Sequence, residues 1–248
     1  MEDHVYIGEL LAGMVYLIVG VRLFRLGQRT REVPERLLAA MFLLSGASYI
    51  VYSMVYLPGL ESLWTPLSFA GRVIYIGPPI LLAVFTRQVF RPKGPWAAWL
   101  VYGIAVLMIG GVGGSALGGD WEGFSPSNGW FWLEWAGFTV PFCWAGTEAF
   151  VQYRQARRRV RLGFCAPGVC NRYLLWALFG ALQACLCLAL LAQYSEYETT
   201  SQFTATWDIL IGGLEIVSVT VISLVFFPPA FYRRWINGNA PAAKAEEG

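Results

Sequence analysis

Residues 67–90 read LSFAGRVIYIGPPILLAVFTRQVF, and this stretch decides how the rest of the chain is interpreted. It is long enough to cross a bilayer as a helix, which takes roughly 20 apolar residues. Arg72 lies inside it, about 9 Å from the end that begins at Pro66. An arginine near the centre of a membrane helix costs roughly 2.5–3.5 kcal/mol, so such a residue faces the bundle interior and has a partner. The sequence therefore predicts a buried ion pair at Arg72.

The composition places the whole chain in a membrane. Of its 248 residues, 56% are hydrophobic and 14% are charged, whereas a soluble domain carries about 25% charged residues. No segment between the apolar runs is long enough to bury a separate soluble core. We expect an all-α, seven-helix transmembrane domain over residues 1–235 and a short disordered cytoplasmic tail over 236–248. The expected spans are residues 5–23, 38–57, 67–90, 96–117, 130–153, 173–194 and 209–232.

The basic residues sort onto alternate connections. Every lysine and arginine except Arg72 lies in or beside the first, third or fifth connection, or in the tail. The positive-inside rule then places these segments in the cytoplasm and the N-terminus outside, as in a protein of a bacterial inner membrane. We expect the cytoplasmic basic face to meet anionic lipid headgroups, with docking of a signalling protein as the alternative. This face comprises Arg154, Arg157, Arg158, Arg159, Arg233 and Arg234.

Polar and aromatic residues recur at helical spacing along several spans. In a bundle surrounded by lipid, such stripes turn toward the bundle axis. Glu9, Glu134 and Glu215 lie about 6–12 Å below the outer ends of their spans, in the same layer as Arg72. We expect Arg72 to pair with Glu134 or Glu215. The predicted outward-facing pocket consists of Arg72, Glu134, Glu215, Glu9, Tyr75, Tyr49, Tyr52 and Trp130.

This pocket has two interpretations. As a functional site, a charged floor with aromatic walls would bind a small-molecule ligand. As a structural feature, the ion pair would fix the register of the helices and the tryptophans would form an interfacial belt. One arginine cannot neutralise three acids, and an unpaired buried carboxylate takes up a proton or contacts water. The surplus of acids therefore favours the pocket slightly.

Prolines and glycines mark special places in the spans. Proline lacks the N–H of a helical hydrogen bond, so it predicts either a hinge or a local packing adjustment. The candidate hinges are Pro78, Pro79, Pro141, Pro228 and Pro229. The fourth span ends GGVGGSALGG, in which small residues at every fourth position permit close helix contact, within the bundle or between protomers. These residues are Gly110, Gly114 and Gly118.

Several function classes are excluded by what the sequence lacks. Lys93 and Lys244 both lie outside the expected spans, so a retinal photoreceptor with a Schiff-base lysine is excluded and no cofactor is expected. The single histidine, His4, and the dispersed cysteines do not form a metal site. The sequence contains no phosphate-binding loop and no nucleophile elbow, and we expect no enzyme activity and no nucleic-acid partner.

Residues 45–90 read SGASYIVYSMVYLPGLESLWTPLSFAGRVIYIGPPILLAVFTRQVF. This run resembles the second and third spans of the seven-transmembrane sensor regions found at the N-terminus of some bacterial histidine kinases. Those regions carry a Tyr-x-Gly followed by proline, matched by Tyr75, Gly77 and Pro78. The resemblance implies a sensor. No kinase domain follows the spans in this sequence, so signalling would require a separate cytoplasmic protein.

Three functions remain as hypotheses, and the structure of the bundle can separate them. A sensor or receptor-like protein predicts an outer cavity closed below by Phe142 and Trp144. A transporter or channel for a small solute or ion predicts a continuous polar lining from Glu215 to Glu148. A non-catalytic membrane assembly subunit predicts an interior filled by side chains, with Arg72 fully paired.

Overall fold

The computed structural model describes residues 4–54, 59–118, 125–201 and 204–238. For residues 4–9, 61, 205 and 237–238 it describes the backbone alone. The described residues form helices joined by short connections, without strands, so the all-α prediction is confirmed for them. The tail expected to be disordered lies outside this part of the chain, apart from residues 236–238 at the end of the last helix.

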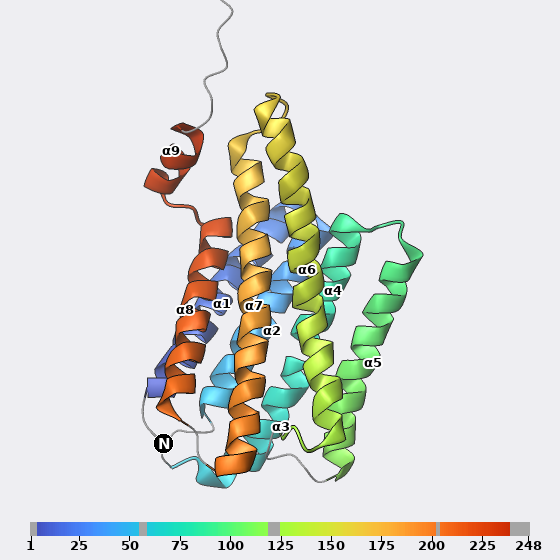
Figure 1. The fold of residues 1–248 in the computed structure, drawn as a ribbon, viewed down its shortest axis with the longest axis vertical. Helices are drawn as coiled ribbons and strands as arrows, with labels where there is room; N and C mark the ends of the chain where they lie inside the picture. Colours follow the sequence, from blue (N-terminus) through green and yellow to red (C-terminus); the bar gives the residue numbers. More distant parts are fainter. Residues whose placement is uncertain (1–3, 55–58, 119–124, 202–203, 239–248) are drawn as a thin grey trace, which may run out of the picture.

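The helices follow the apolar stretches of the sequence (Figure 1). Their bounds are α1 His4–Thr30, α2 Val33–Met54, the 3-10 helix η1 Glu61–Leu63, α3 Trp64–Tyr75, α4 Gly77–Phe90, α5 Pro95–Gly118, α6 Gly129–Arg161, α7 Pro167–Thr200, α8 Ala205–Phe226 and α9 Ala230–Gly238.

The chain is a multi-pass membrane protein. Among the described residues, 6 stretches are long and apolar enough to cross a bilayer. The seventh expected span, residues 130–153, lies in α6 and is not among them. Glu134, Glu148 and several tryptophans lower the hydropathy of this helix, although it packs against α4, α5 and α7 in the middle of the bundle. The 6 stretches are Leu10–Thr30, Val33–Met54, Trp64–Phe90, Pro95–Gly118, Pro167–Thr200 and Thr206–Phe226.

Six helices close a ring in the order α1, α2, α4, α6, α7 and α8, because α8 packs back on α1. The short α3 continues the line of α4 and packs on α2, and α5 lies outside the ring against α4 and α6 (Figure 1). Side chains from opposite sides of the ring fill its interior, including Phe42, Leu82, Phe179 and Ile222, which are at most 2% exposed. This core is shared by all the helices of the ring, and a second, smaller core lies between α4, α5 and α6.

The basic residues gather at one end of this ring. The α4–α5 connection, the α6–α7 connection and α9 lie toward the top of Figure 1, whereas α3 lies at the bottom. All members of the predicted basic face are exposed: Arg154, Arg157, Arg158, Arg159, Arg233 and Arg234. We call this end of the molecule the basic end.

The third expected span is broken in the middle, where its two prolines predict a hinge. α3 ends at Tyr75 and α4 begins at Gly77. Pro78 and Pro79 occupy the first turn of α4, where a missing N–H removes no helical hydrogen bond. A Cβ on Gly77 would lie 2.6 Å from the side chain of Leu44 on α2, so the break lies in close contact with the neighbouring helix.

The other prolines behave differently from each other. Pro141 lies inside α6, which continues through it as one helix. Pro228 and Pro229 separate α8 from α9, so the expected span 209–232 ends at Phe226 instead of bending. The reason is that two consecutive prolines remove two backbone donors and also disfavour the helical conformation of the residue before them.

Candidate functional site

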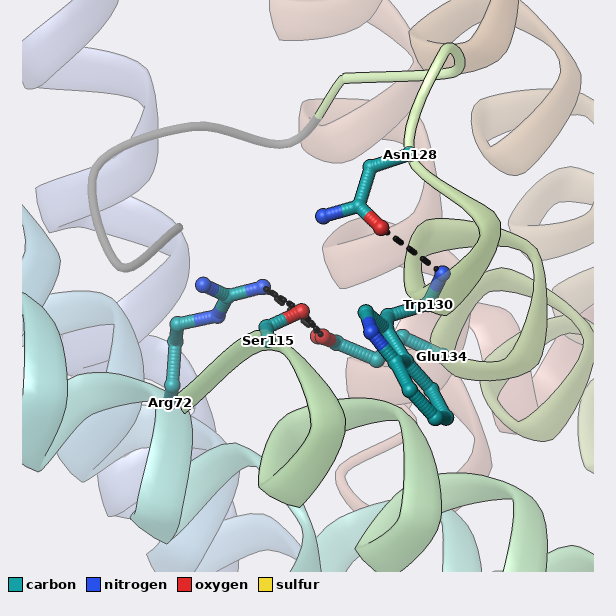
Figure 2. Close-up of polar contacts among 5 residues, drawn as sticks. All are labelled: Arg72, Ser115, Asn128, Trp130 and Glu134. Atoms are coloured by element: carbon teal, nitrogen blue, oxygen red, sulfur yellow. Dashed lines mark hydrogen bonds and ion pairs between the residues drawn. The ribbon is translucent and has the colours of Figure 1, made fainter. Parts of the chain in front are cut away.

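Arg72 is part of a buried polar cluster that joins three helices (Figure 2). Its Nη2 atom donates to Glu134 Oε1 on α6 at 2.7 Å and to Ser115 Oγ on α5 at 3.4 Å. Ser115 Oγ in turn donates to the same carboxylate oxygen at 3.1 Å. Arg72 is 2% exposed and Glu134 is 1% exposed, so the pair is fully removed from solvent. We call these three residues the ion-pair cluster.

The ion-pair cluster keeps one acceptor that the described residues do not use. Glu134 Oε2 is buried and accepts no hydrogen bond from the described part of the chain. A buried polar atom of this kind is unusual in a native interior, where nearly all such atoms have a partner. Glu134 is not among the residues that line the cavity described below, so this oxygen lies in the packed interior beside Arg72.

Close contact between α5 and α6 positions Glu134. A Cβ on Gly111 would lie 2.5 Å from Glu134 Cγ and 2.8 Å from its backbone nitrogen, and one on Gly114 would lie 2.1 Å from the Trp130 ring. The start of α6 is held by Asn128, whose side chain accepts from the Trp130 backbone N–H at 2.9 Å (Figure 2). Because Gly111 and Gly114 have no side chains, the first turns of α6 lie close to α5 and Glu134 can reach Arg72.

The predicted small-residue face does not act as a single contact surface. Gly114 is buried inside the bundle, whereas Gly118 is exposed. A Cβ on Gly110 would meet no described atom within 4 Å. The second glycine against which α6 packs is Gly111, which the every-fourth-position pattern missed. Oligomerisation through Gly110, Gly114 and Gly118 stays a prediction.

The second expected partner of Arg72 takes part in a separate contact. Tyr49 on α2 donates its hydroxyl to Glu215 Oε1 on α8 at 3.1 Å. Glu215 is 6% exposed, so this hydrogen bond is buried as well. The ion pair of Arg72 forms with Glu134, and the expected charged floor is thus divided between two groups of helices.

The remaining residues of the predicted pocket lie around these two groups. The Tyr75 ring stacks on Phe138 with centroids 4.7 Å apart. The Tyr52 ring packs on the backbone of α3, since a Cβ on Gly71 would lie 3.2 Å from it. Trp130 is 43% exposed at the start of α6. The side chain of Glu9 lies outside the described residues, so its predicted role stays untested.

A cavity of about 30 Å³ lies among the helices of the ring. Ligand pockets usually have volumes of roughly 300–1,000 Å³, so in this conformation the cavity is too small for a metabolite. Its walls come from α1, α2, α3, α4, α6 and α7. The polar residues of its lining are Tyr16, Ser45, Ser48, Tyr49, Tyr75 and Gln183. The apolar residues of its lining are Met41, Phe42, Pro78, Phe138, Phe142 and Phe179.

A connected set of aromatic rings runs across the ring of helices between this cavity and the basic end. Phe142 contacts Phe179 with centroids 6.1 Å apart, and Phe179 contacts Trp176 at 5.9 Å. Trp176 then contacts Phe85 at 5.7 Å and Phe226 at 6.1 Å. Phe226 completes the layer at Phe42, 6.0 Å away. Because these side chains come from α2, α4, α6, α7 and α8, we call them the aromatic layer.

Glu148 lies beyond the aromatic layer, in a cluster of its own. Its Oε1 atom accepts from Arg91 Nε at 2.7 Å and from Trp144 Nε1 at 3.3 Å. The Arg91 guanidinium also lies 6.0 Å from the Trp96 ring. The hydrogen bond and the charge of Glu148 raise the pKa of Arg91 above its ordinary value. The two partners differ in burial, since the Arg91 side chain is 46% exposed and that of Glu148 is 7% exposed.

This difference in burial predicts an asymmetry between two substitutions. Arg91→Gln removes the charge that faces a buried carboxylate and should lower the thermal midpoint clearly. Glu148→Gln leaves the half-exposed Arg91 in contact with water and should lower it less. Thermal unfolding of both variants in lipid nanodiscs, followed by circular dichroism, measures the difference. Equal midpoints for the two variants would contradict the assignment of Glu148 as the buried partner.

A second recess lies on the outside of the bundle. It has a volume of about 350 Å³, is open on one side and is formed by α5 and α6. Lipid acyl chains fill such a recess in a bilayer, because its walls are mostly apolar. Its lining consists of Leu100, Trp135, Ala136, Thr139, Val140, Cys143, Trp144 and Thr147, none of which is charged.

Sequence reasoning found the polar residues of the site more readily than the aromatic ones. It anticipated Phe142 as a closing residue but missed Phe42, Phe179 and Phe226, because a buried phenylalanine has the same pattern whether it packs a core or seals a path. It also missed Ser115. The isolated polar side chain of this residue within an apolar span was the available signal.

Comparison of the chain with protein-family models, with curated proteins and with solved structures finds no match. The function therefore has to be inferred from the geometry of the ion-pair cluster, the cavity and the aromatic layer.

Proposed function

We propose that this membrane protein is a receptor-like sensor that passes no solute, with its basic end in the cytoplasm of a bacterial cell. The aromatic layer carries this proposal. A transport route from Glu215 to Glu148 would have to cross Phe42, Phe142 and Phe179, which have no polar group to replace the hydration of a solute. The outer half of the ring, by contrast, holds the ion-pair cluster, the Tyr49–Glu215 contact and the cavity.

The break between α3 and α4 gives such a sensor an element that can move. Arg72 lies on the α3 side of the break, and Pro78 lines the cavity on the α4 side. Ser48 on α2 donates to the Gly71 carbonyl at 3.3 Å, which connects α3 to the neighbouring helix. A ligand held in the cavity beside Tyr75 and Pro78 would shift α3 relative to α4, and α4 ends next to Arg91 at the basic end. The Tyr75, Gly77 and Pro78 run that resembles histidine-kinase sensor regions lies at this break.

A second candidate is a non-catalytic assembly subunit. The small volume of the cavity, about 30 Å³, and the full burial of the ion pair favour it. In this case the ion-pair cluster would only fix the register of α3, α5 and α6, and the protein would act by binding another membrane protein.

Ligand-dependent thermal shifts test these candidates. The purified protein in nanodiscs is exposed to a panel of small metabolites that carry N–H or O–H donors, and Tyr49→Phe is compared with wild type. The matched control is Tyr102→Phe, because Tyr102 is 64% exposed on the outside of α5. We expect at least one compound to raise the midpoint of wild type and Tyr102→Phe by several degrees, and that of Tyr49→Phe by less.

The other outcomes decide against the proposal. Uptake of a panel compound into proteoliposomes, above that of empty liposomes, would show a transporter and refute the closed layer. No shift with any compound and no uptake would favour the assembly subunit. A shift that Tyr49→Phe leaves unchanged would place the ligand away from the cavity.

A further inference from the structure

The recess on the outside of α5 and α6 adjoins a group of cations on the side of the basic end. Trp144 lines the recess, and its ring centroid lies 5.7 Å from that of Trp96, in the first turn of α5. The Arg91 guanidinium lies 6.0 Å from the centroid of the same Trp96 ring. The apolar recess and the charged α4–α5 connection are therefore neighbouring parts of one surface.

Arg91 is held in place and still has groups available for a ligand. Its Nε atom donates to the buried Glu148. Within the described ranges this is the one hydrogen bond that its side chain forms, so neither Nη group is used. The Arg91 side chain is also 46% exposed. Because a guanidinium is a rigid fork of donors, one that is oriented through Nε can offer both Nη groups to a phosphate.

Two further cations lie close to Arg91 in the chain, and neither forms an ion pair with a described residue. Arg87 lies one turn earlier on α4, and its buried Nε atom has no hydrogen-bond partner in the described part of the chain. The two arginines continue the row of Ile80 and Val84, which pack on the core shared with α5. Lys93 is exposed in the α4–α5 connection. One carboxylate cannot neutralise three cations, so this group keeps a net positive charge.

The recess has the length of one lipid leaflet. Its lining on α6 runs from Trp135 to Thr147, which is about 18 Å of helix. One half of the hydrocarbon core of a bilayer is roughly 15 Å thick. The walls of the recess carry no charge, and it is open on one side. An acyl chain can therefore enter it from the bilayer, with its headgroup level with Arg91.

We infer that this surface is a binding site for one anionic phospholipid of the leaflet at the basic end. Its phosphate binds Arg91, next to the charges of Arg87 and Lys93, and one of its acyl chains lies in the recess between α5 and α6. The site is separate from the basic face on α6 and α9, which attracts headgroups by charge alone. The inference does not depend on the sensor proposal, since an assembly subunit with the same surface would bind the same lipid.

Native mass spectrometry of the full chain in detergent, titrated with single lipids, tests the charged part of the site. The probes are phosphatidylglycerol and phosphatidylcholine with identical acyl chains. We expect the first phosphatidylglycerol to bind several-fold more tightly than the first phosphatidylcholine. Arg87→Gln should reduce this preference, whereas Arg158→Gln, which removes an exposed arginine of the basic face, should preserve it. If Arg87→Gln does not fold, Lys93→Gln provides the same test.

Two results of this titration would overturn the inference. Equal affinity of the wild type for the two lipids would show that the cations do not select the headgroup. An equal loss of preference in Arg158→Gln and in the Arg87 or Lys93 variant would show that the basic end attracts anionic lipids only by its overall charge.

Two cysteines offer a matched test of the recess. Cys143 on α6 and Cys185 on α7 are both exposed, but of these two Cys143 alone lines the recess. Cys143→Phe places a ring where the acyl chain would lie, so it should weaken phosphatidylglycerol binding several-fold, whereas Cys185→Phe should not. Glycerol phosphate, which has the charge without the chains, should compete only weakly. Unchanged binding in folded Cys143→Phe, or full displacement by glycerol phosphate at the concentration of the lipid, would show a site for free phosphate and refute the lipid site.

Discussion

Replacement of Arg72 by methionine is expected to destabilise the protein by roughly 3–5 kcal/mol, the usual effect of breaking a buried ion pair from one side. The reason is that Glu134, which is 1% exposed, would lose its charged partner and, among the described residues, would keep only the hydrogen bond from Ser115. A methionine has about the same length and flexibility as the arginine stem, so lost packing contributes little. Reversible unfolding in mixed micelles measures the free energy of unfolding of each variant.

The double variant Arg72→Met/Glu134→Met is the control for this prediction. It removes both charges together, and replacing a buried pair by apolar residues is often neutral. We expect it to recover most of the stability that Arg72→Met loses, with a coupling free energy above about 1 kcal/mol, as for residues in direct contact. If the two single effects simply add, Arg72 and Glu134 are not paired in the membrane, and the central feature of the site is wrong.

Arg72 could be identified from the sequence because it is the one basic residue that does not lie in or beside a connection between spans or in the tail. Its partner could be narrowed to Glu134 or Glu215 by depth, but not further. Depth along a helix follows from counting residues, whereas the rotation and tilt of each helix depend on packing against its neighbours. α5 decides between the two acids, since Gly111 on that helix lets α6 approach.

The distinction between position along a helix and packing between helices also explains which parts of the fold could be predicted. Long apolar runs fix the positions of most helices, and the two prolines at Pro78 and Pro79 mark the break between α3 and α4. The end of α8 at Phe226 was missed because the apolar run continues past it, and hydropathy alone does not register the lost backbone donors of Pro228 and Pro229. The aromatic layer depends on contacts among five helices, which no single stretch of sequence contains.

Gly111→Ala is expected to be the other strongly destabilising substitution, by about 1–3 kcal/mol for an overpacked interior. The added Cβ would lie 2.8 Å from the Glu134 backbone nitrogen and 3.1 Å from the Trp130 carbonyl oxygen. Backbone atoms cannot turn aside as the end of a side chain can, so α6 as a whole has to move away from α5. Thermal unfolding in nanodiscs, with the same reversible unfolding assay for the free energy, measures the loss.

Gly110→Ala is the matched control, because Gly110 precedes Gly111 in the same helix and a Cβ there meets no described atom within 4 Å. Alanine favours a helix over glycine by roughly 0.5–1 kcal/mol, so this variant should be neutral or slightly more stable. If α6 moves in Gly111→Ala, Glu134 moves with it and the ion pair weakens. The substitution should then cost less in the Arg72→Met/Glu134→Met background, where no ion pair is left to weaken. An equal cost in both backgrounds would mean that the α5–α6 contact and the ion-pair cluster are independent, and that Gly111 does not position the site.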